Sequence, residues 1–111
     1  QATEKGLMAL NPAVQGARHN IQKITWMRLN GEPVDLTSSI LSGTLKPKEG
    51  KTRKVMGTLT INDGKKGIFL WFYGEKDVSE AGMFTAQFKA YFPDGTYEIS
   101  LAEKFEIKEQ Q

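Results

Sequence analysis

The sequence predicts an all-β domain, built as an antiparallel sandwich or a small barrel, and three observations support this. Short runs rich in β-branched and aromatic residues recur at intervals of about ten residues. Turn signals such as "NGEP", "NDGKKG" and "PDGT" separate the runs. Several runs alternate apolar and polar side chains, which is typical of strands with one face against a core. The 111 residues are enough for one such domain.

The N-terminal segment, residues 1–18, shows no sustained period because Gly6, Pro12 and Gly16 interrupt its apolar residues. We expect an arm with at most one short strand or turn, followed by a sandwich domain over residues 19–111. A terminus without stable structure is the alternative for this segment.

Three strands are predicted between residues 20 and 61. The first, "NIQKITWMRL", carries Ile24 and Trp26 two positions apart and ends at a hairpin-type turn, "NG". In "SILSGTLKP", alternate residues from 41 to 45 share one face. In "TRKVMGTLTI", alternate residues from 55 to 61 do the same.

The next run, "IFLWFY" over residues 68–73, is apolar throughout. A sandwich strand has one core face, and Trp71 and Tyr73 lie on the side opposite Ile68, Leu70 and Phe72. The set that does not enter the core is exposed, covered by the arm or buried against a partner, and the pattern leaves these alternatives open.

Residues 83–92, "MFTAQFKAYF", alternate most regularly, and every second residue from Phe84 to Phe92 is expected in the core. Phe and Ala take turns along this face, which suits a sandwich interior. The turn "PDGT" then leads to a last strand over residues 97–107, whose odd-numbered apolar residues are expected to face the core. Glu103 interrupts that face and predicts a bulge or a strand end.

The segment before residue 83 resembles part of a known fold. Asp77, with Glu80 three positions later, predicts a capping box for a short helical turn. In "SEAGMFTA", the order of Glu80, Gly82, Phe84 and Ala86 resembles the turn and strand F of immunoglobulin-like domains. Those domains have a cysteine where Ala86 stands, and this chain has no cysteine. The resemblance implies an antiparallel immunoglobulin-like β-sandwich of about seven strands without a disulfide.

A second resemblance covers most of residues 20–108. Its motifs are the turn 31–37, the strand 67–73, the corner 77–84 and the hairpin 92–96. They are similar to those of small immunoglobulin-like domains in tailed-phage baseplate and tail accessory proteins, with the baseplate upper protein N-terminal family nearest. The resemblance implies a structural role in the virion, which would be assembled in the host cytoplasm.

The sequence offers little for catalysis or for metal binding. His19 is the single histidine, and the lack of cysteine removes thiolate ligands and a cysteine nucleophile. The turns at Asp63 and Asp94 lack the alternating acidic residues of a calcium loop. We therefore expect a protein that is not an enzyme and that uses no cofactor and no metal.

The expected function is protein–protein contact within a virion, as a tail, baseplate or surface accessory component. The expected partners are other virion proteins and further copies of the chain. The predicted contact residues are Leu7, Met8 and Leu10 of the arm, Trp71 and Tyr73 of the apolar strand, and, as a polar rim, Lys48, Lys51 and Arg53.

Two features allow other interpretations. The basic hairpin "LKPKEGKTRK" is either a solvated loop or a docking surface for an acidic partner. Nucleic acid is disfavoured because no aromatic residue interleaves with these cations. An exposed Trp71 could instead stack on sugars, so the alternative function is a carbohydrate-binding module for host-surface glycans. No segment approaches the roughly 18 consecutive apolar residues of a membrane span, so a membrane is not an expected partner.

Overall fold

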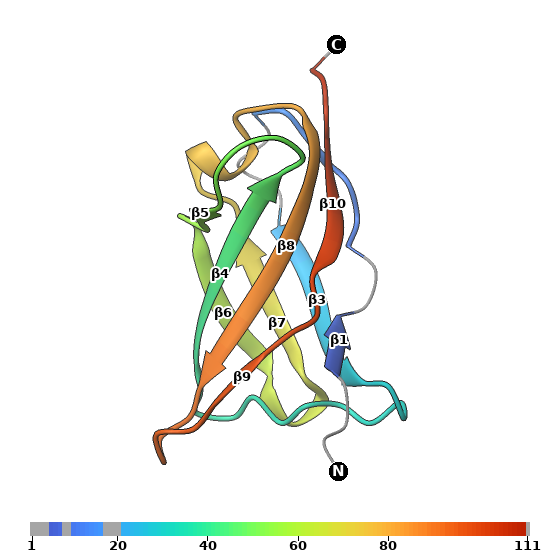
Figure 1. Cartoon of the computed structure of the whole chain (residues 1–111). Coiled ribbons are helices and arrows are strands. Elements are labelled where there is room, and N and C mark those ends of the chain that lie inside the picture. Colours follow the sequence, from blue (N-terminus) through green and yellow to red (C-terminus); the bar gives the residue numbers. More distant parts are fainter. Residues whose placement is uncertain (1–4, 8–9, 17–20, 111) are drawn as a thin grey trace.

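The computed structural model, which describes residues 5–7, 10–16 and 21–110, is a sandwich of two β-sheets (Figure 1). The four-stranded sheet contains, in spatial order, β1 (Lys5–Leu7), β3 (Ile21–Arg28), β7 (Ile68–Phe72) and β6 (Thr58–Asp63). The six-stranded sheet contains β2 (Ala13–Val14), β10 (Glu103–Lys108), β8 (Gly82–Tyr91), β4 (Ile40–Pro47) and β5 (Arg53–Lys54), with β9 (Tyr97–Ile99) also paired to β8. Two short 3-10 helices are η1 (Gly64–Lys66) and η2 (Glu75–Val78). In the described part of the chain, no helix is long and apolar enough to cross a membrane.

The strand order is that of an immunoglobulin domain. In spatial order, β1, β3, β7 and β6 take the places of strands A, B, E and D, and β10, β8, β4 and β5 take those of G, F, C and C′. The short β2 carries the N-terminal segment across to the second sheet, where it pairs in parallel with β10. The other strand pairings are antiparallel. The prediction of an all-β immunoglobulin-like sandwich without a disulfide is confirmed.

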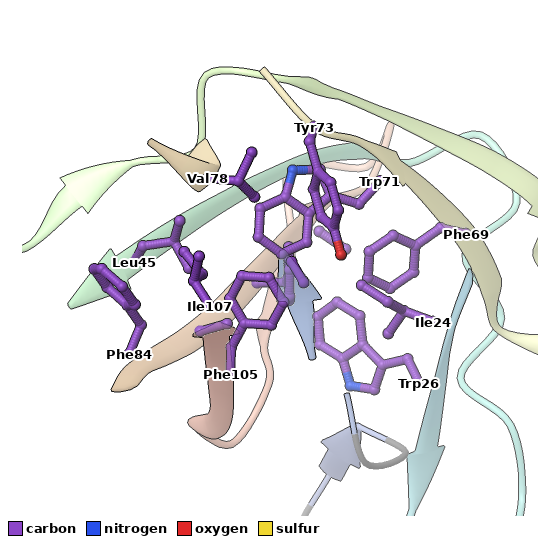
Figure 2. Close-up of a cluster of buried hydrophobic side chains, with 14 of the residues drawn as sticks. Ile24, Trp26, Leu45, Phe69, Trp71, Tyr73, Val78, Phe84, Phe105 and Ile107 are labelled. Atoms are coloured by element: carbon purple, nitrogen blue, oxygen red, sulfur yellow. The ribbon is translucent and has the colours of Figure 1, made fainter. Parts of the chain in front are cut away.

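Aromatic side chains join the two sheets around Trp71 (Figure 2). The Trp71 ring, from β7, lies 5.0 Å from the ring of Phe105 on β10 and 5.8 Å from that of Phe88 on β8. Tyr73 meets the same Trp71 ring edge-on at 4.8 Å. Each such pair contributes about 0.5–1.5 kcal/mol beyond its buried area, so these contacts hold the sheets together where no disulfide does.

The inward faces predicted for β4 and β8 are confirmed. The side chains of β8 that the alternation assigns to the core are all buried, namely Phe84, Ala86, Phe88 and Ala90. On β4, Leu45 is fully buried and Leu41 packs against the core. Phe92 follows the end of β8 and is half-buried against the same core.

The last predicted strand is divided into β9 and β10, and its first half was assigned to the wrong face. Tyr97 and Ile99 are 54% and 48% exposed, whereas Phe105 and Ile107 are buried. Ile99 is paired with Lys89 of β8, and Glu103 is paired with Ala86. Between these two pairs the last strand has one more residue than β8. The last strand thus contains one extra residue, which reverses the side chains that face the core.

A buried carboxylate fixes the loop between β7 and β8. Asp77 is fully buried, and its Oδ1 accepts the N–H of Met56 at 2.7 Å. Its Oδ2 accepts the backbone N–H groups of Gly57 at 2.8 Å and Gly74 at 2.9 Å, and the indole N–H of Trp71 at 3.0 Å. The predicted capping box has the wrong register, because η2 begins at residue 75 and Asp77 is its third residue. Asp77 ties three separate loop and strand positions together.

The described part of the predicted arm belongs to the sandwich. β1 pairs with β3 and β2 pairs with β10, so the segment contributes to both sheets. Between these strands the Gln22 amide holds the backbone of Asn11, accepting its N–H at 2.7 Å and donating to its carbonyl at 2.9 Å. The predicted boundary after residue 18 therefore does not separate an arm from the domain. Strands of two or three residues are too short to show a sequence period.

Candidate functional site

Trp71 and Tyr73, predicted as partner contacts, are core residues. They are 0% and 8% exposed, and the polar atom of each has a partner within the chain. The Trp71 indole donates to Asp77, and the Tyr73 hydroxyl accepts the Gln22 amide at 2.8 Å. Burial raises the pKa of Tyr73, although the hydrogen bond from Gln22 opposes the shift. The prediction of a contact surface at these two residues is wrong, because β7 turns its odd-numbered side chains into the core.

The predicted contacts in the N-terminal segment have different outcomes. Leu10 is half-buried and packs against the core of its own chain, so its apolar contacts are made within the domain. The backbone of Leu7 lies in β1 opposite Trp26. The side chain of Leu7 and all of Met8 lie outside the described residues.

The basic hairpin between β4 and β5 has two exposed lysines and one engaged arginine. Lys48 and Lys51 are exposed, and their role as contacts stays a prediction. Arg53 is half-buried: its guanidinium donates to backbone carbonyls of η2 and lies 5.4 Å from the centre of the Phe84 ring. Arg53 therefore braces η2 against the sheet instead of forming a free polar rim.

The side chains of "IFLWFY" that do not enter the core lie on the outer side of the four-stranded sheet. Because Trp71 fills the core, Ile68, Leu70 and Phe72 point outward along β7. Phe72 is 38% exposed and is paired with Ile21 of β3, which is 52% exposed. We call the surface formed by Ile21, Ile68, Leu70 and Phe72 the β3–β7 face.

A second surface, on the six-stranded sheet, was missed at the sequence level. Tyr91 of β8 and Tyr97 of β9 are paired across the strands, with ring centres 5.9 Å apart and ring planes at 46°. The Lys89 ammonium lies 4.9 Å from the Tyr91 ring centre and 4.4 Å from that of Tyr97. Hydrogen bonding to Tyr91 raises the pKa of Lys89. The alternation of β8 correctly predicts that Lys89 and Tyr91 face outward. The outward orientation of Tyr97 was not predicted, because the last strand contains an extra residue after Ile99.

Two aspartates of the described turns, Asp35 and Asp94, accept hydrogen bonds from the threonine two positions later. Hydrogen bonds from the hydroxyl and backbone N–H of Thr37 lower the pKa of Asp35, and those of Thr96 lower the pKa of Asp94. Within residues 5–7, 10–16 and 21–110, no group of three or more His, Cys, Asp or Glu residues is placed to hold a metal ion. His19 lies outside these ranges.

Comparisons with known proteins identify no family. No family model matches the sequence, and no curated protein matches it. Among solved structures, that of murine CRIg is similar over 97% of this chain and 99% of its own, with 12% sequence identity and a TM-score of 0.49. At that identity and score, the assignment of the immunoglobulin-like fold rests on the strand order and the core of the chain itself.

Proposed function

We propose that the chain is a non-enzymatic structural protein of a phage virion, in the tail, the baseplate or a surface accessory component. It acts through contacts with other virion proteins, including further copies of itself. The resemblance of residues 20–108 to phage baseplate and tail domains supports the virion role. The β3–β7 face is the single structural observation that carries the protein-contact role.

The β3–β7 face is apolar where an outer sheet face is normally polar. Antiparallel sheets commonly cover one side with the core and present polar side chains to water on the other. Here Phe72 and Ile21 are directly opposite each other and both substantially exposed, and half-buried Leu70 and Ile68 continue the row. Removing this row from water contributes about 25 cal/mol per Å² of apolar surface, which offsets part of the freedom that two chains lose on association.

The occupant that we propose for the β3–β7 face is a second copy of the chain. Among the outward positions that the structure describes on β3 and β7, Lys23, opposite Leu70, alone is charged, and its long side chain can lie along the apolar row with the ammonium in water. The edge strand β6 turns Thr58 and Thr60 outward beside the apolar row. An apolar centre with a polar rim is the usual anatomy of a protein interface.

Sedimentation across a range of protein concentrations tests this contact. The wild-type chain should associate as its concentration rises, and Phe72→Lys should stay monomeric because it places a charge in the Phe72–Ile21 pair, the most exposed apolar pair of the face. Ile40→Lys is the matched control, since Ile40 is 73% exposed on the other sheet. A wild-type chain that stays monomeric, or an equal effect of both variants, would contradict the proposed self-contact.

The virion role has a separate test in the genomic neighbourhood of the coding sequence. Genes for tail or capsid proteins on either side would support it. A neighbourhood without any gene for a particle component would count against it, whatever the chain does in solution.

A further inference from the structure

The outer face of the six-stranded sheet is strongly basic. The alternation of β8 fixes which side chains point outward, and the strand register extends that assignment to its neighbours. We call this surface the β4–β8 face. Its charged members, in the described chain, are Lys46, Lys54, Lys89, Lys104, Lys108 and Glu106. Five lysines against one glutamate make the face complementary to an anionic ligand.

One of these lysines is held in position by aromatic rings. The Lys89 ammonium lies within 5 Å of both tyrosine ring centres, at 4.9 Å and 4.4 Å, which is the range of a cation–π contact. Tyr91 and Tyr97 remain 43% and 54% exposed beside it. A side chain that is already ordered loses less conformational entropy on binding. Lys89 can therefore bind an anion beside the two rings at a lower entropic cost than a free lysine.

Hydroxyl side chains lie next to the lysines in two depressions that flank β4. One depression of about 130 Å³ is lined by Ser42, Thr44, Gln87 and Lys89. Another, of about 340 Å³, is lined by the same two β4 residues and by Lys54. The hydroxyl groups of Ser42 and Thr44 thus lie between two lysines, Lys89 and Lys54.

From this arrangement we infer that the β4–β8 face binds an acidic saccharide, one whose sugar rings carry carboxylate or sulfate groups. The acid groups pair with Lys89 and Lys54, the C–H face of a sugar ring packs on Tyr97, and ring hydroxyls bond to Ser42 and Thr44. The inference goes beyond the proposed function and does not depend on it, because it uses the other outer face of the sandwich. Glycan binding predicted at Trp71 is excluded by the burial of that residue.

Two features of the β4–β8 face favour a saccharide over a nucleic acid. Arginine, which pairs with phosphate through two parallel hydrogen bonds, is not among the outward residues that the structure describes on this sheet. The hydroxyl and amide groups of Ser42, Thr44 and Gln87 suit a ligand rich in hydroxyl groups. A neutral saccharide would leave the lysines without an anion.

Calorimetric titration of the full chain with matched pairs of glycans tests the inference. The acidic probes are tetragalacturonate, sialyllactose and a sulfated galactan oligosaccharide, and their neutral counterparts are the methyl ester, lactose and the desulfated oligosaccharide. At least one acidic probe should bind about tenfold or more tightly than its counterpart, and Lys89→Gln should remove most of that difference. Tyr97→Ala should weaken binding of the same probe. Its melting temperature should stay close to that of wild type, because Tyr97 is an exposed residue.

Lys66→Gln is the matched control, since Lys66 is an exposed lysine of η1, which lies outside both the β3–β7 face and the β4–β8 face. Unchanged binding by this variant assigns the effect to the β4–β8 face. The inference is overturned if no probe binds, or if acidic and neutral probes bind equally. It is also overturned if Lys66→Gln loses as much binding as Lys89→Gln, or if single-stranded oligothymidylate binds more tightly than every glycan.

Discussion

Asp77→Asn is predicted to lower the free energy of unfolding by about 3 kcal/mol or more. An asparagine has one acceptor oxygen, which in its better orientation still faces the three donors now at Oδ2. Its NH2 group then opposes the N–H of Met56, which is left without an acceptor. One buried unsatisfied donor costs about 1–3 kcal/mol, and each remaining bond loses roughly 1 kcal/mol with the charge. Relief from burying a carboxylate offsets part of this total.

Urea denaturation followed by tryptophan fluorescence measures the effect directly, because the Trp71 indole is one of the four donors. Glu80→Gln is the matched control: it makes the same chemical change at an exposed position between η2 and β8, and should stay within about 0.5 kcal/mol of wild type. The reasoning is refuted if Asp77→Asn loses less than about 1 kcal/mol, or if the control loses as much.

Three further changes test the core and its surroundings. Phe88→Ala should cost about 3–5 kcal/mol, because its fully buried ring packs edge-on against Trp71; a near wild-type melting temperature would mean that β8 faces the other way. Gly57→Ala should lower the free energy of unfolding by about 1–3 kcal/mol, because a Cβ there would lie 2.0 Å from the carbonyl oxygen of Phe72; an unchanged urea midpoint would contradict that packing. The raised pKa of Tyr73 means that the folded state holds this proton more tightly than the unfolded chain does. Its contribution to stability is present below about pH 10 and is lost as the pH rises further. Above about pH 10, the wild-type chain should lose more of its free energy of unfolding than Tyr73→Phe does. Equal losses in the two proteins would contradict the raised pKa of Tyr73.

The parts of the fold that the sequence predicts are the strands with one buried face. In β8, small and aromatic apolar residues alternate with polar ones, so the sequence states both the strand and its orientation. In β7 every residue is apolar, and such a run carries no information about which side faces the core. Polar partners decide the question: Asp77 accepts the indole N–H of Trp71, and Gln22, distant in sequence, meets the hydroxyl of Tyr73.

The candidate surfaces were harder to predict for the same reason. The β3–β7 face exists because Trp71 and Tyr73 turn inward, so an error in the orientation of β7 moved the predicted surface to the wrong residues. Tyr97 faces outward beside Tyr91, although Phe105 and Ile107 at the same odd spacing face inward, because one extra residue lies between β9 and β10. Alternation within one run cannot reveal such an insertion, because the orientation of β9 is set by its pairing with β8.

The parallel pairing of β2 with β10 has a mechanical consequence. β1, which precedes β2, and the end of β10 lie at opposite ends of the sandwich (Figure 1). Tension applied through the two ends of the chain would pull β2 and β10 in opposite directions along their common axis. The bonds near Ala13 and Ile107, and the one from the Gln15 N–H to the Lys108 carbonyl, would then be loaded together and not opened one after another. A junction loaded in this way resists force better than a hairpin that unzips, so these few residues would set the force at which the domain yields.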